Sequence, residues 1–352
     1  MISVAVPAPG RLAIVEIPKP KPGPYEAVVR TVLALVCNAT DRKLLQGHFP
    51  GIGRERYPLL LGHESVGIVE SVGSKVRSFA PGDRVIGGLL LRPTDDRYTS
   101  GWGGNSEYVV ATDHEAMAAD GVADEAHGWA EVAQIMRRVP EDIPFESAGL
   151  LCTWREVYAA FEDFRLAPGQ DILVFGAGPV GQSFCRFARL LGLGWIGVVD
   201  PLPEKRERAK NGGADAVFAP EAPELQDLAA RRGRRLDAVV DAVGSQEVLN
   251  AGLPLIRMGG SICVYGVLAG ETVTVHKGAG PYNFNLYMHQ WPTRKAEAAA
   301  QEPLVEWIRQ GKLRHEEFVT QEFPVTEIAK AMSAAQEPAS LKTILRFPRA
   351  AP

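Results

Sequence analysis

The first part of the chain alternates short apolar runs with proline and glycine, a pattern typical of β-strands separated by turns. The runs that predict strands are ISVAVP (2–7), RLAIVEIP (11–18), EAVVRTVLALV (26–36), HESVGIVESVG (63–73), GDRVIGG (82–88) and NSEYVVAT (105–112). We therefore expect residues 1–153 to form a β-rich domain. Residues 115–138 interrupt this pattern and predict an Ala-rich helical insertion.

From about residue 155 the pattern changes to helices and buried strands in alternation. The alternating segments are REVYAAFEDF (155–164), DILVFGAG (171–178), VGQSFCRFARLLG (180–192), WIGVVD (195–200), LDAVVDAVG (236–244) and SICVYGV (261–267). Strands that alternate with helices form parallel sheets, because each helix returns the chain to the end of the sheet where the preceding strand began. We expect an α/β domain with a doubly wound parallel sheet over residues 154–290.

The regular alternation ends after TVTVHKG (272–278), and an irregular segment follows at residues 279–292. Beyond it, the pattern predicts one long helix over residues 294–313 and two strands at residues 316–323 and 341–347. We expect residues 291–352 to return to the first domain.

Composition narrows the possible functions. A chain of 352 residues with 46% hydrophobic residues exceeds what one core usually holds, which favours two domains. A net charge of −4 argues against nucleic acid as a partner. The sequence shows neither a charged and apolar leader nor an apolar run long enough to cross a bilayer, so we expect a cytoplasmic protein with a small-molecule substrate and no membrane partner.

A glycine-rich turn carries the first sign of chemistry. In VFGAGPVGQ (174–182), three glycines lie between a predicted strand and a predicted helix, the arrangement that cradles the pyrophosphate of a dinucleotide. Asp200 ends the next strand, where a carboxylate accepts hydrogen bonds from the ribose of NAD and repels a 2′-phosphate. The expected cofactor-binding residues are Gly176, Gly178, Pro179, Val180, Gly181, Asp200 and Lys205. The alternative is a turn that merely connects strand and helix.

A second group of residues fits a metal. Catalytic zinc takes three ligands from Cys, His or carboxylate side chains. Cys37 and His63 each follow a strand-like run, and Glu64 stands beside the histidine to orient the site or bind the metal transiently. Cys152 lies at the predicted domain junction and is a candidate third ligand. The alternative is that these cysteines are small core residues, as we expect for the two others, Cys185 and Cys263.

These motifs together resemble the zinc-dependent medium-chain alcohol and polyol dehydrogenases. The resemblance runs through VCNATD (36–41), GHESVGIVESVG (62–73), GGNSEYVV (103–110), GAGPVG (176–181), DAVVDAVG (237–244) and MGGSICVYG (258–266) in family order. It implies a GroES-like β-rich catalytic domain and a Rossmann cofactor domain, with NAD and a zinc ion that polarises an alcohol. It also implies that Cys37, His63 and Cys152 are metal ligands and that Glu64 is the acid beside them.

The sequence departs from this family in three places. It lacks the closely spaced cysteines that hold a structural zinc, so we expect a single catalytic zinc per chain. The usual C-G-T-D is lengthened to C-N-A-T-D, which places Thr40 one residue late and Lys43 where the family has a relay histidine. We expect Thr40 to relay the proton, the alternative being an N-cap or turn residue. The polyol branch commonly has glutamate at the position of Cys152, which instead resembles the simple-alcohol branch.

The expected substrate is a polyol, sugar or cyclitol, because polar and aromatic groups can pair with several hydroxyls. The candidate lining residues are Trp102, Trp154, Arg155, Glu156, Tyr282, Asn283, Asn285 and His289. Three alternatives remain: a dehydrogenase of simple alcohols, a zinc-free reductase of the same fold, and a non-enzymic NAD-binding protein. The resemblance further implies a homo-oligomer, either a dimer or a tetramer.

Overall fold

The computed structural model describes residues 1–268, 270 and 272–348, which divide into two compact units. The first unit contains Met1–Thr153 and Gln301–Pro352, and the second contains Trp154–Ala300. Residues 291–300, which the sequence analysis groups with the first domain, belong to the second unit. Glu297 explains this grouping, because it is buried beside Arg155 of the same unit.

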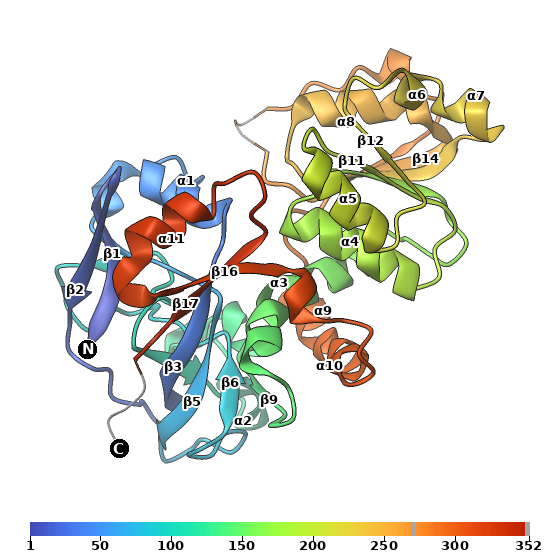
Figure 1. Ribbon diagram of the computed structural model, residues 1–352. Coiled ribbons are helices and arrows are strands. Elements are labelled where there is room, and N and C mark those ends of the chain that lie inside the picture. Colours follow the sequence, from blue (N-terminus) through green and yellow to red (C-terminus); the bar gives the residue numbers. More distant parts are fainter. Residues whose placement is uncertain (269, 271, 349–352) are drawn as a thin grey trace. The chain divides into compact units, whose positions relative to one another are not determined.

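Two sheets form the first unit (Figure 1). The smaller sheet has the order β2-β1-β4-β7 and consists of β1 (Ile2–Ala8), β2 (Arg11–Glu16), β4 (Leu59–Leu60) and β7 (Thr99–Ser100). The larger sheet has the order β16-β17-β3-β5-β6-β9, with β8 also paired to β3. Its strands are β3 (Glu26–Val36), β5 (Ser65–Val72), β6 (Arg84–Ile86), β8 (Tyr108–Thr112), β9 (Arg137–Val139), β16 (Val319–Pro324) and β17 (Lys342–Arg346).

The core of the first unit lies where the C-terminal segment packs on the N-terminal strands. Strand β17 pairs antiparallel with β3, which joins residues more than 300 positions apart in the sequence. The helices of this unit are α1 (Thr40–Gln46), α2 (His114–Ala119), α10 (Gln301–Arg309), α11 (Ile328–Ala334) and the first part of α3 (Phe145–Asp163). Val36, Leu61, Ile328 and Leu345 belong to one buried cluster. The return of the chain therefore completes this core.

The second unit contains one parallel sheet of six strands in the order β12-β11-β10-β13-β14-β15. Its strands are β10 (Ile172–Phe175), β11 (Ile196–Val199), β12 (Ala216–Phe218), β13 (Leu236–Asp241), β14 (Ile256–Val264) and β15 (Asn285–Met288). This is the Rossmann order, in which the winding reverses between β10 and β13. The GroES-like and Rossmann folds expected from the sequence are confirmed.

Helices cover both faces of this parallel sheet. Figure 1 shows α4 and α5 on one side and α8 on the other. Besides the C-terminal part of α3, the helices of this unit are α4 (Pro179–Leu190), α5 (Pro203–Asn211), α6 (Pro223–Gln226), α7 (Leu228–Arg232), α8 (Gln246–Gly252) and α9 (Arg294–Ala299). Cys185 on α4 and Cys263 on β14 are fully buried, and burial raises the pKa of both thiols. They are core residues, as expected.

Three expected elements differ from the structure. The long helix expected over residues 294–313 is two helices, α9 and α10. Pro303 has no N–H to donate to the carbonyl of Ala299, and its ring clashes with that carbonyl, so one continuous helix cannot form there. The irregular segment at 279–292 contains the sixth strand, β15. The insertion at 115–138 is helical only at α2 and continues as short 3₁₀ turns at Glu125–His127 and Glu131–Ile135.

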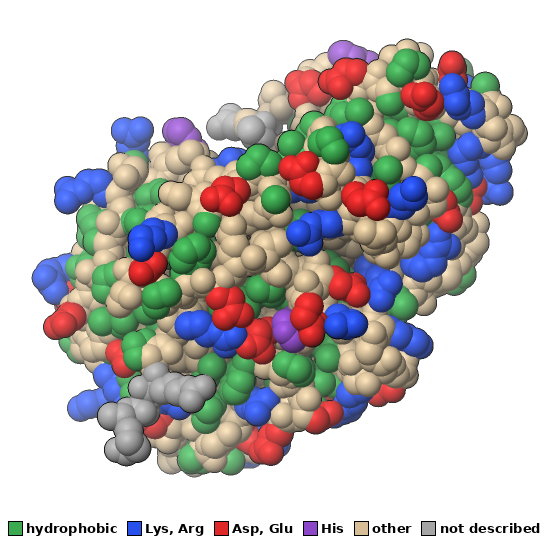
Figure 2. Space-filling model, viewed as in Figure 1, with side chains coloured by type: hydrophobic (Ala, Val, Ile, Leu, Met, Phe, Trp, Pro, Cys, Tyr) green, Lys and Arg blue, Asp and Glu red, His purple; other side chains and the backbone are tan. Residues whose placement is uncertain are grey.

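The surface carries charges of both signs. Figure 2 shows acidic and basic side chains interspersed over the visible face rather than gathered by sign. None of the helices in the described part of the chain has the length and hydrophobicity that a bilayer crossing requires.

Candidate metal and cofactor sites

Cys37, His63 and Glu64 meet where two neighbouring strands end and begin. Cys37 follows the last residue of β3, and the other two immediately precede β5. Because β3 and β5 pair antiparallel with Ala34 opposite Ser65, the end of one strand lies beside the start of the other. One ligand atom from each of the three side chains lies within 4.8 Å of the others. We call these three residues the metal cluster.

The donors of the metal cluster fit zinc. A thiolate and an imidazole are preferred zinc ligands. His63 Nδ1 is buried without a hydrogen-bond partner in the described structure and lies 3.6 Å from Asp41 Oδ1. A carboxylate facing the second ring nitrogen is the usual support for a metal-binding histidine, because it fixes the orientation of the ring. Because Nδ1 faces Asp41, Nε2 is the ring nitrogen that faces the other members of the metal cluster, and it lies 3.8 Å from Glu64 Oε1.

Asp41 connects two of the expected ligands, Cys37 and His63. Its Oδ2 accepts a hydrogen bond from the backbone N–H of Cys37 at 2.9 Å, while Oδ1 faces His63. Burial raises the pKa of Asp41 to about 7, although the nearby His63 lowers it in part. Asp41 is not among the site residues predicted from the sequence, although it belongs to the same VCNATD motif as Cys37.

Glu64 is held by a buried ion pair that the sequence analysis also missed. Lys342 Nζ, from β17, donates to both carboxylate oxygens at 2.7 and 2.6 Å. Thr153 Oγ1 donates to Oε2 at 3.2 Å. Burial alone would raise the pKa of Glu64, but Lys342, His63 and Thr153 together outweigh burial, and the pKa lies below its usual value. Glu64 therefore remains ionised, with its position fixed by three hydrogen bonds.

Cys152 lies outside the metal cluster in this structure. It is buried on α3, and its neighbour Thr153 reaches Glu64. The helix thus approaches the metal cluster one residue beyond Cys152. The structure brings together three of the four expected metal-site residues, and the role of Cys152 stays a prediction.

Thr40 and Lys43 lie on one face of α1, directly after Cys37. Thr40 is the first residue of the helix and Ala39 occupies the N-cap position without a side-chain cap, so Thr40 is not the N-cap residue. Residues three apart on a helix lie side by side, which places Lys43 next to Thr40. Burial lowers the pKa of Lys43 below its usual value, and Arg42 lowers it further.

The ring of Trp102 packs beside His63. The centroids of their rings lie 5.5 Å apart, and the ring of Phe49 meets Trp102 edge-on at 5.4 Å. Trp102 has φ of +69°, a left-handed conformation that costs a residue with a side chain about 1–3 kcal/mol. The flanking Gly101 and Gly103 both donate to Leu60 O, which holds the turn in place. Trp102 is thus fixed beside the metal cluster, as a substrate-lining residue would be.

The other expected substrate residues belong to the second unit. Trp154 and Arg155 are fully buried, so the expectation that they contact the substrate is not supported. Arg155 lies 3.9 Å from the buried Glu297, and Glu156 lies 3.8 Å from Arg294. The remaining candidates lie near β15. Tyr282, Asn283 and Asn285 are exposed, and His289 lies 3.8 Å from Asp163.

The glycine-rich turn connects β10 to α4. Gly176 has φ of +93°, which favours glycine. A Cβ on Gly181 would stand 1.7 Å from Gly176 O, whereas a Cβ on Gly178 would meet no atom within 4 Å. The first and third glycines therefore serve the turn itself, and the second leaves an open face. Pro179 and Val180 begin α4, so its N-terminal N–H groups follow the open face directly. This geometry fits a pyrophosphate.

Asp200 supports the same turn from the end of β11. Its carboxylate accepts hydrogen bonds from the backbone N–H groups of Ala177 at 2.7 Å and Leu202 at 2.9 Å. Each carboxylate oxygen has a further lone pair, so ribose hydroxyls can still donate to it. Lys205, on α5, is partly exposed five residues later. The nearby Arg206 guanidinium donates to the carbonyl oxygens of Asp200 and Pro201.

Two family models and several known proteins match this chain. The alcohol dehydrogenase GroES-like domain matches residues 23–121, and the zinc-binding dehydrogenase domain matches residues 179–290. An NADP-dependent isopropanol dehydrogenase from Thermoanaerobacter brockii is 32% identical over 262 residues, covering 72% of each protein. Sorbitol dehydrogenase from Homo sapiens is 25% identical over 358 residues, covering 98% of this chain and 95% of that protein.

Solved structures show the same fold. Benzyl alcohol dehydrogenase from Acinetobacter calcoaceticus superposes with a TM-score of 0.79 and 21% identity, covering 99% of each chain. The 2R,3R-butanediol dehydrogenase from Bacillus subtilis superposes with a TM-score of 0.78 and 19% identity, also covering 99% of each chain.

Proposed function

The chain belongs to the zinc-dependent medium-chain alcohol dehydrogenase family, and we propose that it transfers hydride between a secondary alcohol of a polyol, sugar or cyclitol and NAD. The observation that carries the proposal is the metal cluster, in which Asp41 orients His63 and Lys342 fixes Glu64. In this proposal, the first unit provides the catalytic residues and the second binds the nicotinamide cofactor.

Cys37, His63 and Cys152 would hold one zinc ion per chain, with Glu64 beside it. Zinc supplies Lewis acidity that favours ionisation of an alcohol hydroxyl near neutral pH, and NAD supplies the hydride acceptor. The buried ion pair with Lys342 keeps Glu64 charged and in place. Cys37→Ala and His63→Ala should therefore abolish both metal binding and turnover.

The remaining catalytic task of the protein is to move a proton. Thr40 is the hydroxyl nearest to Cys37 in the sequence, and it shares a helix face with Lys43. We assign the first transfer to Thr40 Oγ1 and the second to Lys43, whose lowered pKa suits proton exchange nearer neutrality. Trp102 packs against His63 and limits the access of water on that side.

Asp200 supports the choice of NAD over NADP. Its carboxylate is held at the end of β11 by two backbone N–H groups, and a fixed negative charge there repels a 2′-phosphate. The guanidinium of Arg206 is directed to two carbonyl oxygens. The comparison of kcat/KM for NAD and NADP tests this choice, and Asp200→Ala should weaken NAD binding and reduce the preference. A wild-type enzyme that uses both cofactors equally would contradict it.

The relatives support a polyol as the first candidate substrate. Sorbitol dehydrogenases match this chain along 98% of its length. A simple secondary alcohol is the second candidate, because the ring of Trp102 packs beside His63 and the apolar ring of Phe49 packs against Trp102. Turnover of sorbitol, xylitol and myo-inositol should be compared with that of 2-propanol and 2-butanol by following NADH formation. Higher kcat/KM for the monoalcohols would select the second candidate.

We also propose that the protein is a homo-oligomer. Strand β15 ends the parallel sheet of the second unit, and Leu286 and Met288 are exposed on it. Apolar side chains on an unpaired edge strand favour pairing with another chain. Light scattering after size-exclusion chromatography should give the mass of two or four chains, and the mass of a single chain would contradict the proposal.

A further inference from the structure

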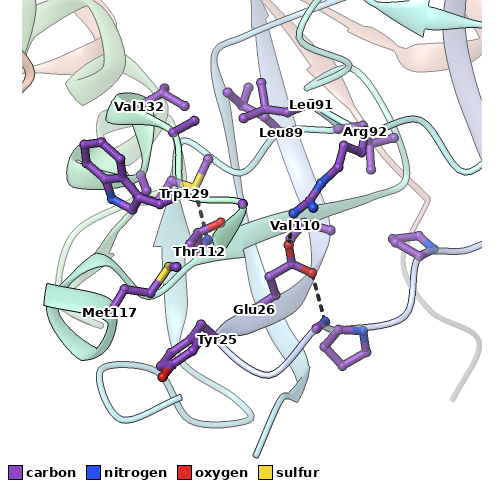
Figure 3. Close-up of a pocket in the computed structure, with 18 of the residues that line it drawn as sticks. Tyr25, Glu26, Leu89, Leu91, Arg92, Val110, Thr112, Met117, Trp129 and Val132 are labelled. Atoms are coloured by element: carbon purple, nitrogen blue, oxygen red, sulfur yellow. Dashed lines mark hydrogen bonds and ion pairs between the residues drawn. The ribbon is translucent and has the colours of Figure 1, made fainter. Parts of the chain in front are cut away.

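The segment between β8 and β9 forms one wall of a cavity of about 710 Å³ (Figure 3). Residues before β3, after β6 and in β8 form the opposite wall. Of the lining residues that the structure describes, none belongs to the metal cluster or to the glycine-rich turn. The volume lies within the range of small-molecule binding sites. The proposed dehydrogenase function leaves this cavity unexplained.

The inner walls of the cavity are apolar and fixed in position. Met117 and Met136 are 2% and 5% exposed, and Met136 Sδ accepts a hydrogen bond from the backbone N–H of Thr112 at 3.1 Å. The indole N–H of Trp129 donates to His114 Nδ1 at 3.1 Å, which fixes the orientation of the ring. Thioethers and an aromatic ring in these positions suit a flat apolar body, because sulfur and aromatic atoms contact rings favourably.

Glu26 and Arg92 lie at the mouth of the cavity and pair with each other (Figure 3). Glu26 Oε1 accepts from Arg92 Nη2 at 2.8 Å, and Oε2 accepts from the backbone N–H of Gly23 at 2.8 Å. Both carboxylate oxygens are therefore engaged. The Arg92 side chain is 71% exposed, and a guanidinium carries five N–H donors. Among the described residues, no other hydrogen bond to a protein acceptor is found for Arg92.

Arg92 also reaches the wall formed by the insertion. A Cβ built on Gly128 would stand 3.1 Å from Arg92 Nη1, so the guanidinium passes closely over the backbone there. The Arg92 side chain thus extends from Glu26 on one side of the cavity to Gly128 in the segment between β8 and β9. Lys21 lines the same mouth, and no ion pair is found for it within the described structure.

The lining carries two positive side chains, Lys21 and Arg92, and two negative ones, Glu26 and Glu125, so the positions of these groups decide which charge a ligand meets. His127 pairs with Asp124, both on the exposed turn that precedes Trp129. Glu125 is the other acidic residue of the lining and lies on the same exposed turn. Because Glu26 is already engaged, the hydrogen-bonding capacity left at the mouth is mainly that of Arg92 and Lys21, which favours an anionic group.

We propose that this cavity is a second small-molecule site that binds an aromatic monocarboxylate. The carboxylate pairs with Arg92 and Lys21, and the ring lies between Trp129 and the two methionines. Guanidinium and carboxylate match in a planar, two-bonded geometry, which gives Arg92 the leading role. The proposal does not depend on the dehydrogenase function, because binding alone is the predicted property.

Calorimetric titration with phenylacetate and with its neutral analogue phenylacetamide tests the proposal. Phenylacetate should bind saturably with one site per chain, and phenylacetamide should bind about tenfold more weakly because it cannot form the charged hydrogen bonds. Equal binding of the two compounds, or no binding of phenylacetate at millimolar concentration, would overturn the proposal.

Variants locate the bound compound. Arg92→Ala should weaken phenylacetate binding by about tenfold or more. Arg97→Ala is the matched control, because Arg97 is also 71% exposed and pairs with Asp95 outside the cavity lining, and it should bind like the wild type. Val132→Trp should fill the cavity and prevent binding without a change in the melting midpoint. His63→Ala should retain binding, since loss in that variant would place the carboxylate at the metal cluster and refute the proposal.

Discussion

The metal cluster and the glycine-rich turn are both expected to bind a cofactor, yet they are assembled in different ways. The turn consists of consecutive residues between β10 and α4, and its shape depends on backbone conformation at Gly176 and Gly181. The metal cluster takes its side chains from the ends of β3 and β5 and its supporting charge from β17. A local site depends on steric space, whereas a dispersed site depends on buried charges that must be paired.

The largest effect is expected at the buried ion pair of the metal cluster. Lys342→Met leaves the Glu64 carboxylate buried without its partner, which should lower the free energy of unfolding by about 3–5 kcal/mol. Urea unfolding measures this change. The double variant Lys342→Met, Glu64→Leu removes both charges and should recover much of the lost stability. A single variant within about 1 kcal/mol of the wild type would show that the metal cluster does not depend on this pair.

The second-largest effect is expected when the hydroxyl of Thr40, the proposed proton carrier, is removed. Thr40→Val preserves the shape of the side chain but removes the hydroxyl, so kcat should fall about 10²-fold or more. Zinc content and NAD affinity should not change. Lys43→Ala should give a smaller loss that added small amines partly restore. If Thr40→Val lowers stability by about 1 kcal/mol and keeps full turnover, Thr40 has a structural role and the proposed proton path is wrong.

The glycines of the turn allow a matched pair of substitutions. Gly181→Ala places a Cβ against Gly176 O and should lower stability by about 1–3 kcal/mol, because backbone atoms have to move. Gly178→Ala meets no atom of the protein and should leave the melting midpoint unchanged, but it should weaken NAD binding by about tenfold since backbone and pyrophosphate approach closely there. Equal melting midpoints for the two variants would contradict the different roles assigned to these glycines.

The sequence predicted the local site more completely than the dispersed one. Three glycines at fixed spacing, a preceding strand and Asp200 were sufficient to place the turn. For the metal cluster, Cys37, His63 and Glu64 were predicted, but Lys342 is 278 residues away from Glu64 along the chain. The only local sign was a lysine inside the apolar run LKTIL (341–345), where a buried charge requires a partner.

Helix geometry explains why two of the expected substrate residues are buried. Trp154 and Arg155 were chosen because they follow Cys152, but successive side chains on a helix point about 100° apart, with 3.6 residues per turn. Neighbours of a helical residue therefore do not share its surroundings, and these two are buried. Trp102, which was also an expected lining residue, packs beside His63 in the structure, from a turn between two glycines.

The zinc content of the purified protein, measured together with NAD-dependent turnover, tests the central claim most directly. The donor set of Cys37, His63 and Cys152 predicts about one zinc per chain, with both zinc and activity lost in Cys37→Ala while the fold is retained. Cys263→Ala is the matched control, because its thiol is buried in the second unit and should leave zinc content unchanged. Two zinc ions per chain, or full turnover without zinc, would contradict the account.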